Sequence, residues 1–206
     1  MLMMKKIGIL VIILGVLITT MNITMQAKEN VSMNLLVQIP NASQFYLVEM
    51  KDQQVKVKTI EGNLYTKINA LHGEKATLSS IDFKDSYNIL CDTLEDRLHV
   101  KIDHYVSIDM NAIIQALSLP SDSYDYTTLS SLISCAKMIK NHFKMSLITH
   151  YRDYVNTDLS VNDLYTLYRF FLYDKPKVNY YELRYFTINE KLVVLDTQFH
   201  PAKKQS

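Results

Sequence analysis

Few residues of this chain have the type and spacing that catalysis requires, and the most suggestive group follows a strand-like segment. Val55, Val57 and Thr59 alternate with two lysines, a period of two that predicts a half-buried strand. The segment Glu61-Gly62-Asn63 then breaks the alternation, as a loop at the end of a strand does. Active sites of α/β proteins gather at strand ends. This strand end offers a carboxylate, a glycine and an amide, and it has no arginine, histidine or cysteine.

No metal site is expected from the sequence. The histidines lack the spacing of metal ligands and stand at His72, His99, His104, His142, His150 and His200. They are expected to be structural or surface residues. Asp122 and Asp125 share one loop and could hold a cation, but an isolated acidic pair in a loop is usually solvated. No serine, threonine or cysteine stands in a recognisable nucleophile motif, so no catalytic residue is assigned.

The two cysteines and the arginines are the remaining reactive or charged groups of interest. Cys91 and Cys135 could form a disulfide if the chain is exported. Cys91 shares a predicted helical face with apolar residues, which favours buried free thiols instead. All four arginines follow residue 96, at Arg97, Arg152, Arg169 and Arg184.

The elements that position these residues follow from hydrophobic periodicity. Buried strands are expected at 34–39 and 44–50, and a turn joins the second of these to the half-buried strand at 55–60 as a hairpin. Residues 80–98 have helical spacing, and residues 101–108 return to a strand pattern.

Cap residues predict helices in the second half of the chain. Asp109 is a suitable N-cap, and Ser160 begins a capping box in which Asp163 replaces the usual glutamate. Residues 177–188 and 191–196 predict a closing hairpin that shares the sheet of the first strands. This order predicts an α/β fold, a three-layer α/β/α domain with a mixed central sheet.

The first residues differ in kind from this domain. Lys5 and Lys6 precede an apolar run that continues to Met25, close to the roughly 20 residues that span a bilayer. Residues 1–27 are therefore expected to be a membrane helix that anchors the chain with its domain outside. Cleavage of this segment, with secretion, is the alternative. The domain is expected over 33–198, followed by a tail at 199–206.

The charge balance excludes one class of partner. Without Lys5 and Lys6, 20 basic residues face 21 acidic ones, so the exterior domain is close to neutral. Nucleic-acid binding normally needs a basic surface and is therefore not expected.

The order of the segments resembles the LytR-CpsA-Psr family of membrane-anchored envelope proteins. The resemblance rests on NLLVQI, QFYLVEM, VKVKTI, Lys67-Ile68-Asn69-Ala70, the run DTLEDRLHVKIDHYVSIDMNAII and the helix start NTDLSVNDLYTLYRFF. It implies phosphotransferases that bind a polyprenyl-pyrophosphate-linked glycan with arginines and Mg²⁺. Their products are glycans attached to the cell wall or to protein.

This chain departs from the family pattern where the chemistry would occur. The family strand ends in Ile-Pro-Arg-Asp, whereas this one has Ile60-Glu61-Gly62-Asn63, and the family's metal-binding aspartate falls near Ser43. The resemblance therefore implies a catalytically degenerate binding or regulatory module, with Lys67, Asn69, Arg97 and Arg152 as its ligand-binding residues. An active, Mg²⁺-dependent transferase with relocated arginines is one alternative, and an unrelated exported α/β adaptor is another.

Overall fold

The computed structural model describes residues 31–38, 44–68, 71–80, 87–109, 155–160, 176–189, 191–194 and 198–202, with single positions between 112 and 170. The expected anchor at 1–27, the Asp122–Asp125 loop and Cys135 lie outside these residues. No helix among those described is long and apolar enough to cross a membrane.

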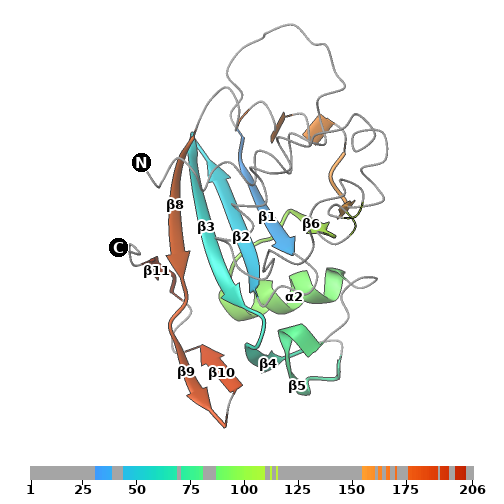
Figure 1. Ribbon diagram of the computed structural model, residues 1–206, viewed down its shortest axis with the longest axis vertical. Helices are drawn as coiled ribbons and strands as arrows, with labels where there is room; N and C mark the ends of the chain where they lie inside the picture. The colour runs from blue at the N-terminus through green and yellow to red at the C-terminus, as the bar shows by residue number, and fades with distance from the viewer. Residues whose placement is uncertain are drawn as a thin grey trace, which may run out of the picture.

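A mixed seven-stranded sheet forms the centre of the fold (Figure 1). Its order is β11-β8-β3-β2-β1-β6-β7. The strands are β1 (Met33–Gln38), β2 (Gln44–Lys51), β3 (Gln54–Glu61), β6 (His104–Ile108), β7 (Val155–Thr157), β8 (Lys177–Glu182) and β11 (His200–Pro201). The β1–β6 and β3–β8 pairs are parallel, and the other pairs are antiparallel. The predicted mixed sheet is confirmed.

The predicted hairpin of β2 and β3 is also confirmed. The strands pair from Gln44 opposite Glu61 to Lys51 opposite Gln54. Between them Asp52 and Gln53 have φ values of 49° and 65°, and positive φ at both central residues matches the twist of a two-residue hairpin.

Strand β3 is more buried than the alternation of apolar residues and lysines in its sequence predicted. Lys58 was expected on a solvated face, but its side chain is 13% exposed and forms an ion pair with Glu49. Its ammonium also lies 4.6 Å from the centre of the Phe199 ring. Phe199 lies just before β11, so the far end of the chain covers this face. Within 199–206, expected as a tail, His200 pairs with Glu182 of β8.

One helix covers the sheet among the described residues. Helix α2 (Tyr87–Leu98) buries Leu90, Leu94 and Leu98 in a core cluster with Leu36 of β1 and Leu47 of β2. The helix was expected to begin at Ser80, but Leu78–Ser80 is a short 3₁₀ helix, η2. The residues expected to form the second helical layer lie largely outside the described part of the chain.

Both predicted caps form hydrogen bonds. Asp109 Oδ1 accepts from the backbone N–H of Ala112 at 3.0 Å. Ser160 Oγ accepts from the N–H of Asp163 at 3.2 Å, while Asp163 Oδ2 accepts from the N–H of Ser160 at 3.0 Å. Asp163 therefore completes the capping box as a glutamate would.

Of the predicted closing hairpin, residues 177–182 join the main sheet as β8, but the paired strands that follow do not. Strands β9 (Tyr185–Ile188) and β10 (Lys191–Val194) pair with each other in a separate sheet beyond the end of β8 (Figure 1). The pairing of β8 with β3 ends at Glu182, and the next side chain, Leu183, is buried in the core cluster. The chain leaves the sheet because Leu183 turns into the core.

Candidate functional site

Backbone carbonyls just after the end of β3 accept hydrogen bonds from a neighbouring segment. The carbonyl of Gly62 accepts from the N–H of Ser79 at 2.7 Å, and that of Leu64 accepts from the N–H of Leu78 at 3.0 Å. Gly62 and Leu64 are both buried. The resemblance drawn from the sequence implies an arginine at the position of Gly62, but this chain has there a buried residue without a side chain.

The carboxylate of Glu61 lies in a network of neutral partners. Glu61 Oε1 accepts from Gln44 Nε2 at 2.8 Å, and Gln44 Oε1 accepts from the hydroxyl of Tyr46 at 3.0 Å. The backbone N–H of Glu61 donates to the hydroxyl of Tyr185 at 3.0 Å. None of these partners, all within the described part of the chain, is a cation.

The electrostatics of this network disfavour an anionic ligand. Burial raises the pKa of Glu61, the hydrogen bond from Gln44 opposes that rise, and the charge of Glu182 adds to it. Burial and the charge of Glu61 raise the pKa of Tyr46 to about 12. A site that binds a pyrophosphate needs positive charge, and this one concentrates negative charge.

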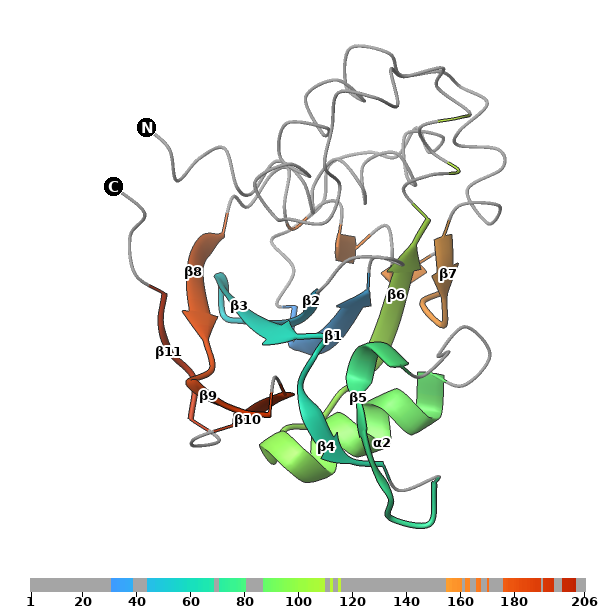
Figure 2. The same ribbon diagram turned by 60° about the horizontal axis from the view of Figure 1, so that its bottom comes forward.

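Strands β4 (Tyr65–Lys67) and β5 (Lys75–Thr77) form a hairpin that lies beside α2 (Figure 2). A cavity of about 370 Å³ lies between this hairpin and the helix. Its lining residues are Tyr65, Thr66, Lys67, Lys75, Thr93, Asp96 and Arg97. The cavity brings together two of the four residues selected from the sequence, Lys67 and Arg97. The other two, Asn69 and Arg152, lie outside the described residues.

The cations of this cavity come from two elements. Lys67 and Lys75 are directly opposite each other in the antiparallel β4–β5 pair, an arrangement in which like charges destabilise the hairpin. Arg97 lies one helical turn after Thr93 on α2, so both side chains occupy one face of the helix. Asp96 is the carboxylate among the lining residues, which leaves an excess of positive charge.

Two residues that line this cavity also carry a buried polar atom without a hydrogen-bond partner among the described residues: Thr93 Oγ1 and Arg97 Nε. Thr93 is 1% exposed. Buried polar groups are normally hydrogen-bonded, so each such group calls for an explanation.

Sequence reasoning did not select Lys75 or Thr93. Thr93 had a weak signal in the sequence, since it precedes Arg97 by four residues in a predicted helix. Lys75 could be found only from the β4–β5 register.

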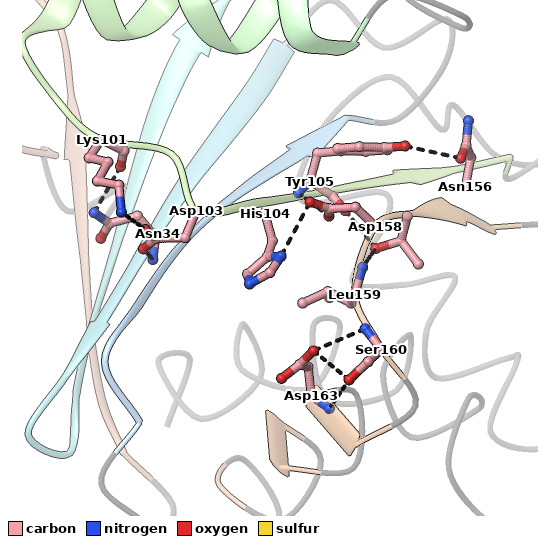
Figure 3. A network of polar contacts seen from close by, with 11 residues as sticks. Asn34, Lys101, Asp103, His104, Tyr105, Asn156, Asp158, Leu159, Ser160 and Asp163 are labelled. Carbon is pink, nitrogen blue, oxygen red and sulfur yellow. Dashed lines mark hydrogen bonds and ion pairs between the residues drawn. The ribbon is translucent and has the colours of Figure 1, made fainter.

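Two further titratable groups, Asp158 and Cys91, have environments that the structure defines. Asp158 joins β6 to the segment after β7: its carboxylate accepts from the N–H of Tyr105 at 2.9 Å and lies 3.2 Å from His104 Nδ1 (Figure 3). Cys91 is a free thiol, and burial followed by the charge of Glu95 and other carboxylates raises its pKa to about 12. Such a thiol is a poor nucleophile at neutral pH. Among the described residues no three potential ligands meet that could hold a metal ion.

Comparison with known proteins finds relatives only by structure. No protein-family model and no curated protein matches the chain. A transcriptional regulator from Enterococcus faecalis matches with a TM-score of 0.55 and 14% identity, over 79% of this chain and 81% of that one. TagU from Bacillus subtilis matches with a TM-score of 0.55 and 12% identity, over 79% and 89%.

A third match carries a bound lipid. It is the LytR-CPS2A-psr family protein YwtF (TagT) of B. subtilis with octaprenyl pyrophosphate, at a TM-score of 0.53 and 16% identity, over 85% and 88% of the two chains. The resemblance inferred from the order of segments is thus confirmed for the fold, and the chain has the fold of the LytR-CPS2A-psr proteins.

Proposed function

We propose that this protein is a membrane-anchored, extracytoplasmic LytR-CpsA-Psr-like component of the bacterial cell envelope. In this proposal it binds a polyprenyl-linked glycan or a cell-wall polymer and does not transfer it. The fold supports the proposal, since the similar protein TagT has structures bound to octaprenyl pyrophosphate and to LI-WTA.

The residues at the end of β3 are the observation that supports a loss of glycan transfer. Transfer from a pyrophosphate requires cations and aligned donors that stabilise the charge of the transition state. At this end Gly62 is buried and has no side chain, and the adjacent Glu61 carboxylate is held by Gln44. A negative group there opposes the binding of a phosphate at that position.

The test measures binding and transfer separately on the full-length chain. We expect binding of a polyprenyl-pyrophosphate-linked glycan and no Mg²⁺-dependent release of the polyprenyl carrier. Gly62→Arg alone should also give no transfer, because catalytic groups that act together are strongly non-additive. Glycan transfer by the unchanged protein would contradict the proposal.

A second candidate function is an active transferase with relocated cations. The gathering of Lys67, Lys75 and Arg97 around one cavity favours it. Mg²⁺ would then be the cofactor implied by the family. In that case Arg97→Ala or Arg152→Ala would abolish glycan transfer, whereas the binding module has no transfer to lose.

The anchor is tested by fractionation of expressing cells. The Lys5–Lys6 pair before the apolar run supports a single membrane helix with the domain outside. We expect the intact chain in the membrane fraction and protease access only from outside. A mature protein that begins at Lys28 in the medium would instead establish secretion.

A further inference from the structure

The hairpin of β9 and β10 has an open edge. Strand β9 pairs with β10 alone, and β10 lies on the side of β9 that faces β4 (Figure 1). Among the described residues, no backbone hydrogen bond joins the other edge of β9 to another segment. A two-stranded hairpin is only marginally stable in water, so a further strand on this edge would stabilise it.

One face of β9 exposes two large apolar side chains. Phe186 is 40% exposed and Ile188 is 49% exposed. Side chains two residues apart lie on the same face of a strand, so these two are neighbours. Tyr185 has the opposite orientation, because it packs against the core cluster and its hydroxyl accepts from the N–H of Glu61. The domain therefore holds the hairpin by one face, and the other face presents apolar surface to solvent.

The backbone groups of β9 alternate between β10 and the open edge. Ile188 and Lys191 flank the two-residue loop, and such a pair exchanges both of its backbone hydrogen bonds. Phe186, two residues earlier, bonds to β10 in the same way. The N–H and C=O groups of Tyr185 and Thr187 therefore point to the open edge, where a further strand could pair with them.

Strand β9 lacks the features that normally protect an edge. Exposed edges are usually blocked by charged side chains or by proline. The outer strand β11 of the main sheet contains Pro201, which has no N–H to donate. Strand β9 has neither a charge nor a proline between Tyr185 and Ile188. Its open edge is therefore able to pair with another strand.

We propose that β9 pairs with β9 of a second copy of this chain, in antiparallel orientation about a two-fold axis at Thr187. In this register the Thr187 residues of the two copies exchange backbone hydrogen bonds. Phe186 of each copy lies opposite Ile188 of the other, so these exposed apolar side chains cover each other twice. The two hairpins then form one four-stranded sheet.

The sequence of β9 favours a second copy over another partner, because the strand is complementary to itself. Its ends have opposite charges: Arg184 precedes the strand and is exposed, and Glu190 follows it in the sequence. Antiparallel pairing brings the basic end of one copy to the acidic end of the other. A register shifted by two residues would instead place Ile188 opposite Arg184.

This pairing goes beyond the proposed function and does not depend on it. Phe186, Thr187 and Ile188 line neither the cavity beside α2 nor the hydrogen-bond network of Glu61. The two copies should therefore associate with or without a bound glycan.

The first experiment measures the protein mass of the full-length chain in a non-ionic detergent. Light scattering during size-exclusion chromatography, corrected for the detergent, gives this mass at a series of concentrations. We expect a concentration-dependent rise toward the mass of two chains. Thr187→Pro removes the central N–H of the open edge and none that bonds to β10, so it should raise the dissociation constant at least about tenfold. Thr187→Val keeps this N–H and is the matched control, which should dimerise like the unchanged protein.

The second experiment tests the register with Thr187→Cys. Opposite residues of a hydrogen-bonded antiparallel pair have Cα atoms about 5.5 Å apart, a separation that a disulfide spans. Under mild oxidation we expect a disulfide-linked dimer of this variant on a non-reducing gel. Lys56→Cys places a thiol on an exposed position of β3 and should give none. Both variants keep Cys91 and Cys135, so their comparison cancels any contribution of these thiols.

Three outcomes overturn the pairing. One is an unchanged chain that stays monomeric at every concentration, which would leave the edge to a strand of another protein. Another is a dimer that survives Thr187→Pro, since it must then form through a different surface, such as the expected membrane helix. The third is equal cross-linking by Thr187→Cys and Lys56→Cys. Thermal unfolding verifies that each variant is folded, and if Thr187→Pro is not, the cross-link decides.

Discussion

At the scale of single residues, two buried or half-buried threonines provide a direct comparison. The hydroxyl of Thr157 donates to the carbonyl of Tyr105 at 2.6 Å and accepts from the N–H of Leu159 at 3.1 Å. The hydroxyl of Thr93 has no partner among the described residues. The same atom therefore stabilises the fold at one position and opposes it at the other.

This difference predicts opposite effects of one substitution. Thr93→Val should raise the free energy of unfolding by about 1 kcal/mol, because it removes an unsatisfied buried hydroxyl and keeps the side-chain volume. Thr157→Val should lower the free energy of unfolding by about 1–2 kcal/mol, since it removes two hydrogen bonds. Denaturant unfolding measures both. Equal destabilisation would mean that the Thr93 hydroxyl has a stabilising partner in the free protein.

The Glu61 carboxyl should affect stability in a pH-dependent way. Its pKa is raised above the ordinary value of 4.5, first by burial, against the hydrogen bond from Gln44, and then by the charge of Glu182. The folded state therefore favours the protonated acid, and the stability that this acid contributes is lost as pH rises through the raised pKa.

Glu61→Gln removes this ionisation and keeps the oxygen that accepts from Gln44. We expect the variant to unfold at a higher denaturant concentration than the unchanged protein at about pH 8, with the difference vanishing near pH 4. Glu182→Gln should produce a smaller gain in stability at about pH 8, because it removes only the repulsion between the Glu182 and Glu61 carboxylates. A difference that does not depend on pH would contradict this explanation.

At the scale of elements, the capping box after β7 is the clearest case of local control. Ser160 and Asp163 exchange hydrogen bonds through both backbone and side chains. Hydrogen bonds with Ser160 lower the pKa of Asp163. The stability that the ionised Asp163 contributes is therefore lost as pH falls through the lowered pKa.

Removing the cap should destabilise the protein measurably. Ser160→Ala is expected to cost about 1 kcal/mol of unfolding free energy at neutral pH. Ser160→Thr keeps the hydroxyl and should cost less, which makes it the matched control. If both variants unfold at the same denaturant concentration as the unchanged protein, the helix start does not depend on this cap.

At the scale of the whole molecule, the sheet joins segments that are far apart in the sequence. Strand β3 pairs with β8 from Gln54 opposite Lys177 to Thr59 opposite Glu182, and β6 pairs with β7. Removal of the C-terminal part would expose one long edge of β3 and the core beneath it. The domain should therefore fold as one unit.

Limited proteolysis tests this unity. We expect no stable fragment that ends near Tyr126, because such a fragment lacks β7, β8 and β11. Mass spectrometry of the digest identifies the fragments that persist, and their thermal unfolding shows whether they are folded. A cooperatively folding fragment from Met33 to about Tyr126 would show that the first half is independent.

The sequence by itself determined the features that depend on near neighbours. The β2–β3 hairpin, the register of helix α2 after Tyr87 and the caps at Asp109 and Ser160 follow from periodicity, turn geometry and short hydrogen bonds. All of these contacts join residues that are near in the sequence, and even the ends of the hairpin, Gln44 and Glu61, are only 17 positions apart. The order of such elements was also sufficient to indicate the fold.

Only the tertiary structure decided which distant segments meet. It separated the β9–β10 hairpin from the main sheet, because Leu183 turns into the core after β8. It also covered Lys58 with Phe199 and brought Lys75 and Thr93 to the same cavity as Arg97. These outcomes depend on competition among apolar surfaces for one core and on pairing between strands distant in sequence, which no local pattern encodes.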